Sequence, residues 1–339
     1  MKQLHPAVSA LIWVVLSFLL IAAVVNMSGS RMLSDLVIHV GILGLFAVSL
    51  NILIGYTGMV AFGHAMFFAS GAYGFGLLMQ TGDFSIPAAI LVSLLGSAVI
   101  ALIVGIVCLN TREIYFAFLT LAIQMMFYSS LLSWVEVTGG DQGLTGGFEK
   151  PVFLGLDMTR PDDAFLFITA TVLLTLGILW HVTRTPFGHV LRMIRDNATR
   201  VEFFGLNVRA YRLGAFVIAS AAASVAGALM SLYVSAAYPN FGYWTMSGEA
   251  IFMIMLGGLN TFLGPLVGAA ILALLNHYVT AYTEYYGLVL GAIILVYVLV
   301  LRRGILDIVV EKFSGGKKGL PAAKQEIPAA KEESRSLPL

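Results

Sequence analysis

Apolar residues in this chain form continuous runs of about 18 to 25 residues, a length that crosses the hydrocarbon layer of a membrane as an α-helix. The runs fall near residues 8–26, 34–54, 59–79, 87–109, 114–134, 164–182, 213–235, 249–262, 264–282 and 284–301. Strands of a membrane β-barrel would instead alternate apolar and polar residues over roughly 10 positions. With 59% hydrophobic and 11% charged residues, the chain is predicted to be an all-α polytopic membrane protein. We expect about eight to ten transmembrane helices, including a broken or re-entrant pair.

The two ends of the chain differ in character. The first apolar run, Ala7 to Val25, is longer than the core of about 7–15 residues found in a secretory signal, so we interpret it as a retained span. Residues 311–339 are polar and rich in Lys, Glu, Pro and Ala, a composition typical of disorder. We therefore predict a transmembrane domain over 1–310 and a flexible cytoplasmic tail over 311–339.

Positive charge gathers in the loop 183–212, which contains Arg184, Arg192, Arg195, Arg200, Arg209 and Arg212. Lys and Arg accumulate in the cytoplasmic loops of membrane proteins, so this loop is predicted to be cytoplasmic. The loop 135–163 is rich in Asp and Glu and is predicted to lie outside. The same rule places both termini in the cytoplasm, and Arg31 alone disagrees with this orientation.

Several function classes find no support in the sequence. The net charge of +1 argues against a nucleic-acid partner, and the single cysteine, Cys108, allows no intramolecular disulfide. Neither a phosphate-binding G-x-x-x-x-G-K-[ST] pattern nor H-E-x-x-H nor G-x-S-x-G occurs. We therefore predict no catalytic residue, no metal site and no cofactor bound by this chain.

The stretch GYTGMVAFGHAMFFASGAYGFG (55–76) combines many glycines with one ionisable side chain, His64. Small residues let helix backbones approach closely in a membrane, so helix packing is the favoured interpretation, and lining a solute path is the alternative. Gly55 and Gly58 would allow a turn where the chain enters the membrane. For His64, a structural hydrogen bond is weighed against a role in a pathway. Gly63, His64 and Gly71 are candidate pathway residues.

A second glycine-rich feature interrupts the chain between the runs 249–262 and 264–282. It reads LGGLNTFLGP, and Gly and Pro together end a helix. Irregular backbone at membrane depth is tolerated where protein or a water-filled cavity covers it, which makes Gly257, Gly258 and Asn260 further pathway candidates. The alternative is an ordinary helix–loop–helix connection at the surface.

Two loops also carry patterns. The outer loop VTGGDQGLTGG (137–147) is interpreted as an ordered feature, with a flexible connector as the alternative. In the arginine-rich loop, Asp196 or Asn197 can cap a short second helix that Gly205 would end. This segment carries apolar Val201, Phe203, Phe204 and Leu206. An exposed apolar helix rimmed by arginines is predicted to enter a groove on a partner, unless it lies on anionic lipid.

Taken together, the segments GYTGMVAFGHAMFFASGAYG, YFAFLTLAIQMM with VTGGDQGLTGG, TPFGHVLRMIRDN…GLN and LGGLNTFLGPLVGAA resemble the LivM-type permeases of the branched-chain amino-acid ABC importer family over residues 30–305. This resemblance implies a multi-pass permease of the bacterial inner membrane, paired with a second homologous permease. Two cytoplasmic ATPase subunits would bind the ATP, and a periplasmic solute-binding protein would deliver the solute. The segment 197–206 would be the ATPase-coupling element, with Asn197, Glu202, Phe203, Phe204, Gly205 and Leu206.

The chain departs from the family pattern at a few positions. Met59 and Ala61 stand where the family often has Gln and Ser, and Ala198, Arg200 and Val201 replace a Glu and alanines. These changes leave the solute open, because permeases for urea, short amides and other amino acids share the fold. The alternative of a different class is a self-sufficient channel or secondary carrier, which would transport without ATPases.

Overall fold

The computed structural model describes residues 29–111, 113–145, 152–153 and 155–282, with a few single positions outside these ranges. Within them the chain is helical, and isolated bridges join Leu144 to Ala237 and Phe153 to Leu156 in place of a sheet. The predicted all-α class is therefore confirmed. The predicted runs 8–26 and 284–301 and the predicted tail 311–339 lie largely outside the described residues.

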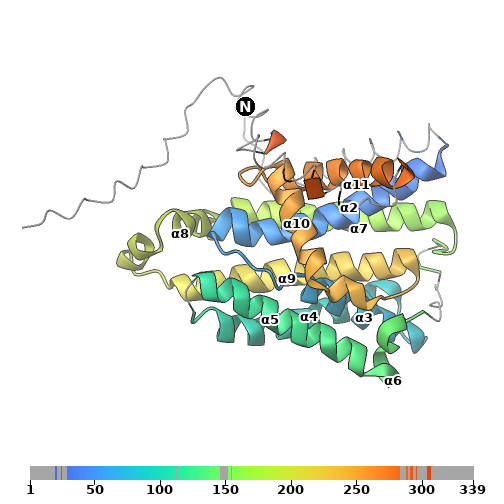
Figure 1. Cartoon of the computed structure of the whole chain (residues 1–339), viewed down its shortest axis with the longest axis horizontal. Helices are drawn as coiled ribbons and strands as arrows, with labels where there is room; N and C mark the ends of the chain where they lie inside the picture. Colours follow the sequence, from blue (N-terminus) through green and yellow to red (C-terminus); the bar gives the residue numbers. More distant parts are fainter. Residues whose placement is uncertain are drawn as a thin grey trace, which may run out of the picture.

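The long helices lie side by side, α10 runs across them, and α8 projects from one end of the bundle (Figure 1). Their bounds are α2 Arg31–Asn51, α3 Ala65–Gln80, α4 Ile86–Cys108, α5 Glu113–Ser133, α7 Pro161–Arg184, α8 Pro186–Phe203, α9 Val208–Val234, α10 Trp244–Gly257 and α11 Gly264–Tyr282. Short elements are η1 (Ile52–Thr57, a π-helix), α6 (Val135–Thr138), η2 (Gly140–Gln142) and η3 (Pro239–Gly242). Among the described residues, α2 with η1, α4, α5, α7 and α9 are long and apolar enough to cross a membrane. The protein is thus a multi-pass membrane protein.

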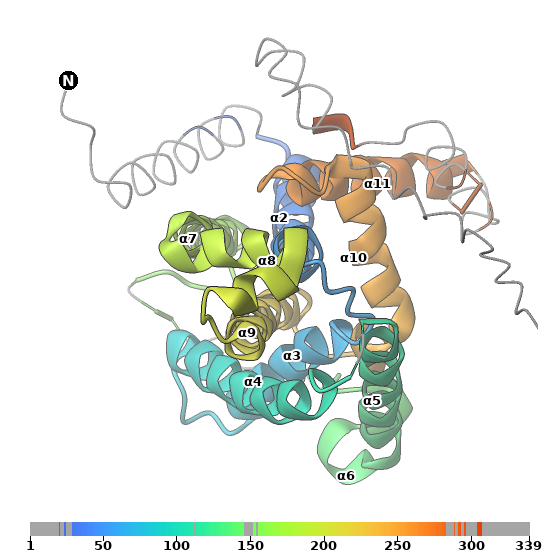
Figure 2. The same cartoon turned by 90° about the vertical axis from the view of Figure 1, so that its left-hand side faces the viewer.

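The centre of the bundle is formed by α2 and α9. Of the most apolar stretch of each helix, 72% is buried in α2 and in α9, compared with 28% in α4, 22% in α5 and 33% in α7. Viewed along the bundle, α9 lies between α7 and α2 on one side and α3 and α4 on the other (Figure 2). The apolar outer faces of α4, α5 and α7 are therefore the surfaces available to lipid.

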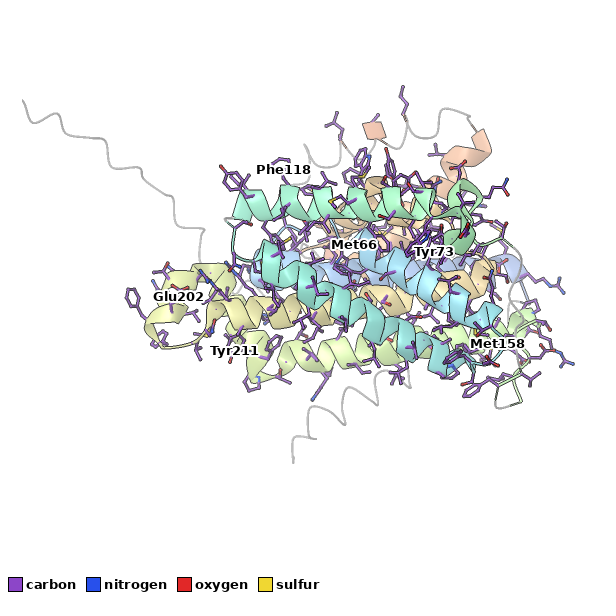
Figure 3. All side chains as sticks on the ribbon, turned by 90° about the horizontal axis from the view of Figure 1, so that it is seen from below. Met66, Tyr73, Phe118, Met158, Glu202 and Tyr211 are labelled. Atoms are coloured by element: carbon purple, nitrogen blue, oxygen red, sulfur yellow. The ribbon has the colours of Figure 1, made fainter. Side chains whose placement is uncertain are left out.

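Helices α3 and α9 approach so closely that their backbones touch. A side-chain Cβ at Gly71 would lie 2.0 Å from the carbonyl oxygen of Ser224, and one at Gly227 would lie 1.8 Å from that of Phe68. Met66 and Tyr73, also on α3, point into the bundle (Figure 3). The packing interpretation of the glycine-rich stretch is confirmed for Gly71.

The predicted run 59–79 is not helical throughout, because the π-helix η1 ends at Thr57 and α3 begins only at Ala65. Gly58 adopts a left-handed conformation (φ 76°), which ends the helix, and the Met59 amide donates back to the carbonyl of Leu53 at 3.0 Å. The chain then runs back along the bundle before α3 starts (Figure 1). Segment 58–64 is the first break in a helix of this bundle.

The second break lies where the sequence predicted it, between Gly257 at the end of α10 and Gly264 at the start of α11. Helix α10 has 14 residues, about 21 Å of helix, which is shorter than the roughly 30 Å of hydrocarbon in a membrane. The outer loop is ordered as predicted: Gly139, Gly140 and Gly143 have positive φ angles around η2. Gly146 and Gly147 of that loop lie outside the described residues.

Candidate functional site

Helix α8 consists of two helical pieces that meet at Asn197. This residue leaves the helical region (φ −164°, ψ 99°), and its side-chain oxygen Oδ1 accepts a hydrogen bond from the Arg200 amide at 2.9 Å. A side-chain acceptor for an amide of the first turn is what a helix N-terminus requires. The predicted cap of a second short helix is therefore confirmed at Asn197.

The second piece of α8 ends at Phe203, and Gly205 follows it as the predicted helix stop. Gly205 is left-handed (φ 78°), and its amide donates to the Glu202 carbonyl at 2.9 Å. Most side chains are strained at such an angle, whereas glycine adopts it freely. The chain can therefore turn at once into α9, whose first turn is capped by Asn207 accepting from the Ala210 amide at 3.1 Å.

The turn between α8 and α9, hereafter the α8 tip (Glu202, Phe203, Phe204 and Gly205), is largely exposed. Phe203 is 87% exposed and Phe204 is 69% exposed, and Glu202 projects at the far end of α8 (Figure 3). Among the described residues these phenylalanines form an apolar surface with nothing packed over it.

The predicted apolar surface is smaller than the sequence suggested. Val201 was expected to belong to it, but this side chain is buried against Ile194 and Val208. Leu206 is half-buried beside the same cluster. Two positions along a helix turn a side chain to roughly the opposite side, so Phe203 points away when Val201 points to α9, and Phe204 lies beyond the last residue of α8.

The other half of α8 contacts the end of η1, a connection that the sequence did not predict. The Arg192 guanidinium lies over the Tyr56 ring, 4.8 Å from its centroid. Arg195 donates from Nη1 to the carbonyl of Gly55 and lies 3.5 Å from Oδ1 of Asn260. These arginines appeared in the sequence only as markers of orientation, since nothing in their spacing names a target.

The candidate residue His64 is fully buried and serves as a structural partner in this conformation. Ser49 Oγ donates to the Phe46 carbonyl at 2.7 Å, so the contact of 2.8 Å between His64 Nε2 and Ser49 Oγ is assigned as a bond donated by the ring. The ring also stacks on Phe46. The structural hydrogen bond expected for His64 is present, with a serine hydroxyl as its partner.

The six candidate pathway residues lie at separate contacts. Gly63 faces the Thr120 carbonyl and Gly71 the Ser224 carbonyl, while Gly257 closes on Gly264. Gly258 has φ 130°, and Asn260 is exposed beside Arg195. That a solute passes along them stays a prediction.

A polar network in the interior joins the start of α3 to α5 and α10. The Ala65 amide donates to Ser247 Oγ at 2.9 Å, and Ser247 donates to Gln124 Oε1 at 2.9 Å. Gln124 donates in turn to the Gly242 carbonyl at 3.2 Å. Sequence reasoning missed Ser247, because a lone serine in an apolar helix carries no signal of a partner more than a hundred positions away.

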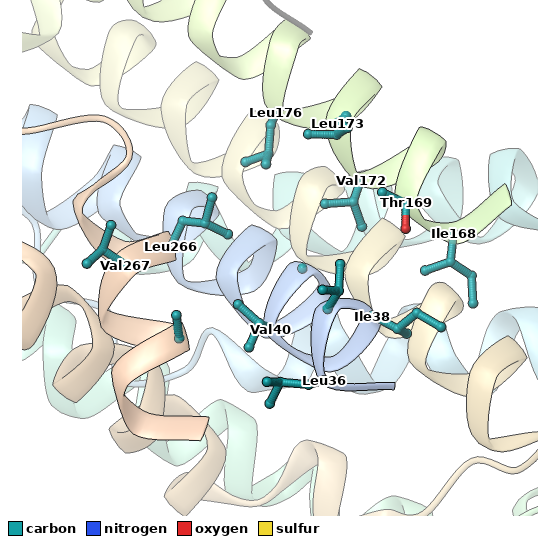
Figure 4. A pocket seen from close by; sticks show the side chains of 13 residues that line it. Leu36, Ile38, Val40, Ile168, Thr169, Val172, Leu173, Leu176, Leu266 and Val267 are labelled. Carbon is teal, nitrogen blue, oxygen red and sulfur yellow. The ribbon is translucent and has the colours of Figure 1, made fainter. Parts of the chain in front are cut away.

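An apolar groove of about 380 Å³ lies among α2, α7 and α11 (Figure 4). Its lining includes Leu36, Val172 and Leu266, and its one polar side chain is Thr169. Amino acids carry a carboxylate and an ammonium group, and burying charge without a partner is costly. The groove therefore does not qualify as a site for such a solute.

Comparison with known proteins assigns the chain to a family. The sequence profile of the family described as "Branched-chain amino acid transport system / permease component" matches residues 32–298. The chain belongs to this family. Membership agrees with the multi-pass helical bundle, and it makes this permease a transport component by family.

The relatives named LivM cover most of this permease, and LivH covers less than half of it. It is 25% identical over 285 residues to the high-affinity branched-chain amino acid transport system permease protein LivM of Escherichia coli, covering 77% of this chain and 67% of the relative. A probable LivM of Methanocaldococcus jannaschii is 25% identical over 284 residues, covering 70% and 78%. The LivH permease of E. coli is 28% identical over 152 residues, covering 44% and 48%. No solved structure matches this permease.

Proposed function

We propose that this permease is a membrane subunit of an ABC importer that carries branched-chain amino acids across the bacterial inner membrane by ATP-driven alternating access. The names of the LivM relatives support the solute class. Similarity to both LivM and LivH proteins supports pairing with a second, similar permease. Two cytoplasmic ATPases and a periplasmic solute-binding protein would complete the transporter, and both termini of this chain would be cytoplasmic.

The observation that carries this proposal is the exposed pair of phenylalanines at the α8 tip. Large aromatic side chains exposed on a short helix are typical of a surface that binds a groove on another protein. The arginines of α8 indicate that this end of the bundle is cytoplasmic, which is the side where the ATPases would lie. Closure of the ATPases on ATP would then move α8 against the bundle and switch it between outward-open and inward-open states.

The first experiment is purification of the tagged permease from mild-detergent membranes, with identification of co-purifying proteins and an ATPase assay. We expect two ATPases and a second permease to accompany it. The reconstituted assembly, supplied with its binding protein, should take up leucine, isoleucine and valine in an ATP-dependent way. Urea and short amides, the solutes of related permeases, serve as the alternatives in the same assay.

A second outcome would support the alternative of a self-sufficient channel or secondary carrier. In that case the permease purifies alone in several detergents and transports solute in liposomes without ATP. Uptake of urea rather than leucine by an ATP-dependent assembly would instead support an importer, but one whose solute is urea and not a branched-chain amino acid.

A further inference from the structure

The inner end of α2 is a helix terminus held by a side chain of another helix. Gly58 ends η1 in a left-handed conformation, so carbonyl groups of the last turn have no amide ahead of them in the helix. Arg195 of α8 donates from Nη1 to one of these, the carbonyl of Gly55. A cation at the carboxyl end of a helix also complements the negative end of the helix dipole.

The same guanidinium touches the second break. Nη1 of Arg195 lies 3.5 Å from Oδ1 of Asn260 in the α10–α11 connection. The end of η1 also meets this connection directly, since a Cβ at Gly55 would lie 2.6 Å from the carbonyl oxygen of Leu259. Arg195 therefore stands where α8, the end of α2 with η1 and the 258–263 connection come together.

Other contacts make α8 suited to pass on a movement. Arg192 covers the Tyr56 ring beside Gly55, and a Cβ at Gly58 would lie 3.3 Å from Arg195 Cγ. Ile194 and Val201 anchor both pieces of α8 to α9 through one buried cluster. A displacement of the exposed tip would therefore be transmitted through this cluster to the first piece of α8, which carries Arg192 and Arg195.

We propose that Arg195 is a positioning residue that couples movement of α8 to both breaks, segment 58–64 and connection 258–263. This proposal rests on the proposed function, since the movement would come from the ATPases. The adjacent Asp196 does not hold Arg195 in place, because their ion pair is long at 3.9 Å and the Asp196 side chain is 76% exposed. The carbonyl of Gly55 and the side-chain oxygen Oδ1 of Asn260 accept from Arg195 and are the contacts that fix its direction.

The chemistry of arginine suits this position better than that of lysine. A planar guanidinium offers several fixed N–H donors and can serve acceptors on two segments at once, whereas an ammonium group acts as a single compact charge. Arg195→Lys should thus keep part of the coupling, and Arg195→Gln should lose nearly all of it.

The test compares Arg195→Gln and Arg195→Lys with Arg209→Gln in the reconstituted transporter. Arg209 is an exposed arginine in the first turn of α9, outside both breaks and the α8 tip. We expect Arg195→Gln to lower the number of solutes taken up per ATP by about tenfold, a factor within the usual range for coupled sites. The number of solutes taken up per ATP should be intermediate for Arg195→Lys and equal to the wild type for Arg209→Gln.

A second measurement follows the contact itself. Amide hydrogen exchange in segment 58–64 and connection 258–263 should be faster in Arg195→Gln than in the wild type, without ATP. A proportional fall of uptake and ATP hydrolysis would overturn the proposal, because it would mean that Arg195 serves ATPase binding. Unchanged exchange in both breaks would overturn it as well. If the wild-type assembly shows no ATP-driven uptake, the proposed function fails, and the exchange data still decide whether Arg195 holds the breaks.

Discussion

The α3–α9 contact and the α8 tip both depend on glycine, for opposite reasons. At Gly71 and Gly227 a side chain has no room, because the backbone of the partner helix lies 2.0 and 1.8 Å from the place of the Cβ. At Gly205 a side chain has open space, with nothing within 4 Å. What matters there is the left-handed backbone, φ 78°.

The contrast between the two regions distinguishes contacts that stabilise the fold of this chain from a surface that we propose binds a partner. The α3–α9 contact is complete within this chain, so its substitutions should act on folding. The α8 tip is well formed but largely uncovered, so its substitutions should act on transport and leave the fold intact.

Valine at either glycine of the α3–α9 contact should destabilise the fold strongly. Gly71→Val or Gly227→Val forces two helix backbones apart, which we expect to destabilise the bundle by about 3 kcal/mol, the upper range for overpacking. The measurement is the yield and thermal unfolding of the purified permease in detergent.

Gly96→Val is the matched control for this pair. Gly96 lies on the outer face of α4 and has nothing within 4 Å of its Cβ position. The same substitution there should change stability by no more than about 0.5 kcal/mol. Equal losses at Gly71 and Gly96 would show that valine is harmful in any of these helices and would remove the argument from close approach.

Aspartate at the α8 tip should abolish uptake without loss of protein. Phe203 and Phe204 contribute little to the fold, so Phe203→Asp with Phe204→Asp should change stability by less than about 0.5 kcal/mol. A charge facing an apolar groove is costly, and we expect the ATPases to dissociate. The measurements are uptake, membrane level and ATPase co-purification.

Leucine at both positions keeps an apolar surface and should retain most of the uptake. Wild-type uptake by the aspartate variant would contradict the coupling role of the α8 tip. It would favour the self-sufficient carrier.

Loss of the Ser49 hydroxyl should destabilise the interior to a smaller degree. Ser49→Ala removes the acceptor of the His64 ring at full burial, and leaving a buried donor unsatisfied costs about 1–3 kcal/mol. Thermal unfolding in detergent measures the change. Ser70→Ala is the control, since Ser70 only donates to the carbonyl of Phe67 in its own helix. If both variants unfold alike, the Ser49–His64 bond contributes nothing of its own.

The sequence predicted those features that depend on local chemistry. The apolar runs predicted the helices, Asn197 and Gly205 predicted the limits of the second piece of α8, and the pair of glycines at 257–258 predicted the second break. Each of these follows from side chains and glycines acting on their own neighbours in the chain.

Contacts between distant segments were beyond the sequence. A turn at Gly58 was predicted, but residues 59–64 were expected to be helical because they are as apolar as a helix. The burial of Val201 depends on where α9 lies. Arg195 reaches Gly55 across 140 positions, and Ser247 reaches Gln124 across 123. A single sequence contains no information on such pairs, because polar partners are set by the packing of the helices between them.

Alanine at Gly205 should give the smallest effect and the sharpest test of the comparison. A non-glycine residue in the left-handed region costs about 1–2 kcal/mol, enough to lower the ratio of correctly formed to relaxed α8 tips by at least roughly fivefold. We expect uptake to fall accordingly while the thermal unfolding of the permease stays close to wild type, because a terminal turn can relax locally.

Gly82→Ala is the control, because it introduces the same strain (φ 72°, nothing within 4 Å) at the opposite end of the bundle and should leave uptake unchanged. Equal losses of uptake at Gly82 and Gly205 would mean that the α8 tip is no more sensitive than any other exposed turn, and the division between a self-contained interior and a partner-dependent tip would fail.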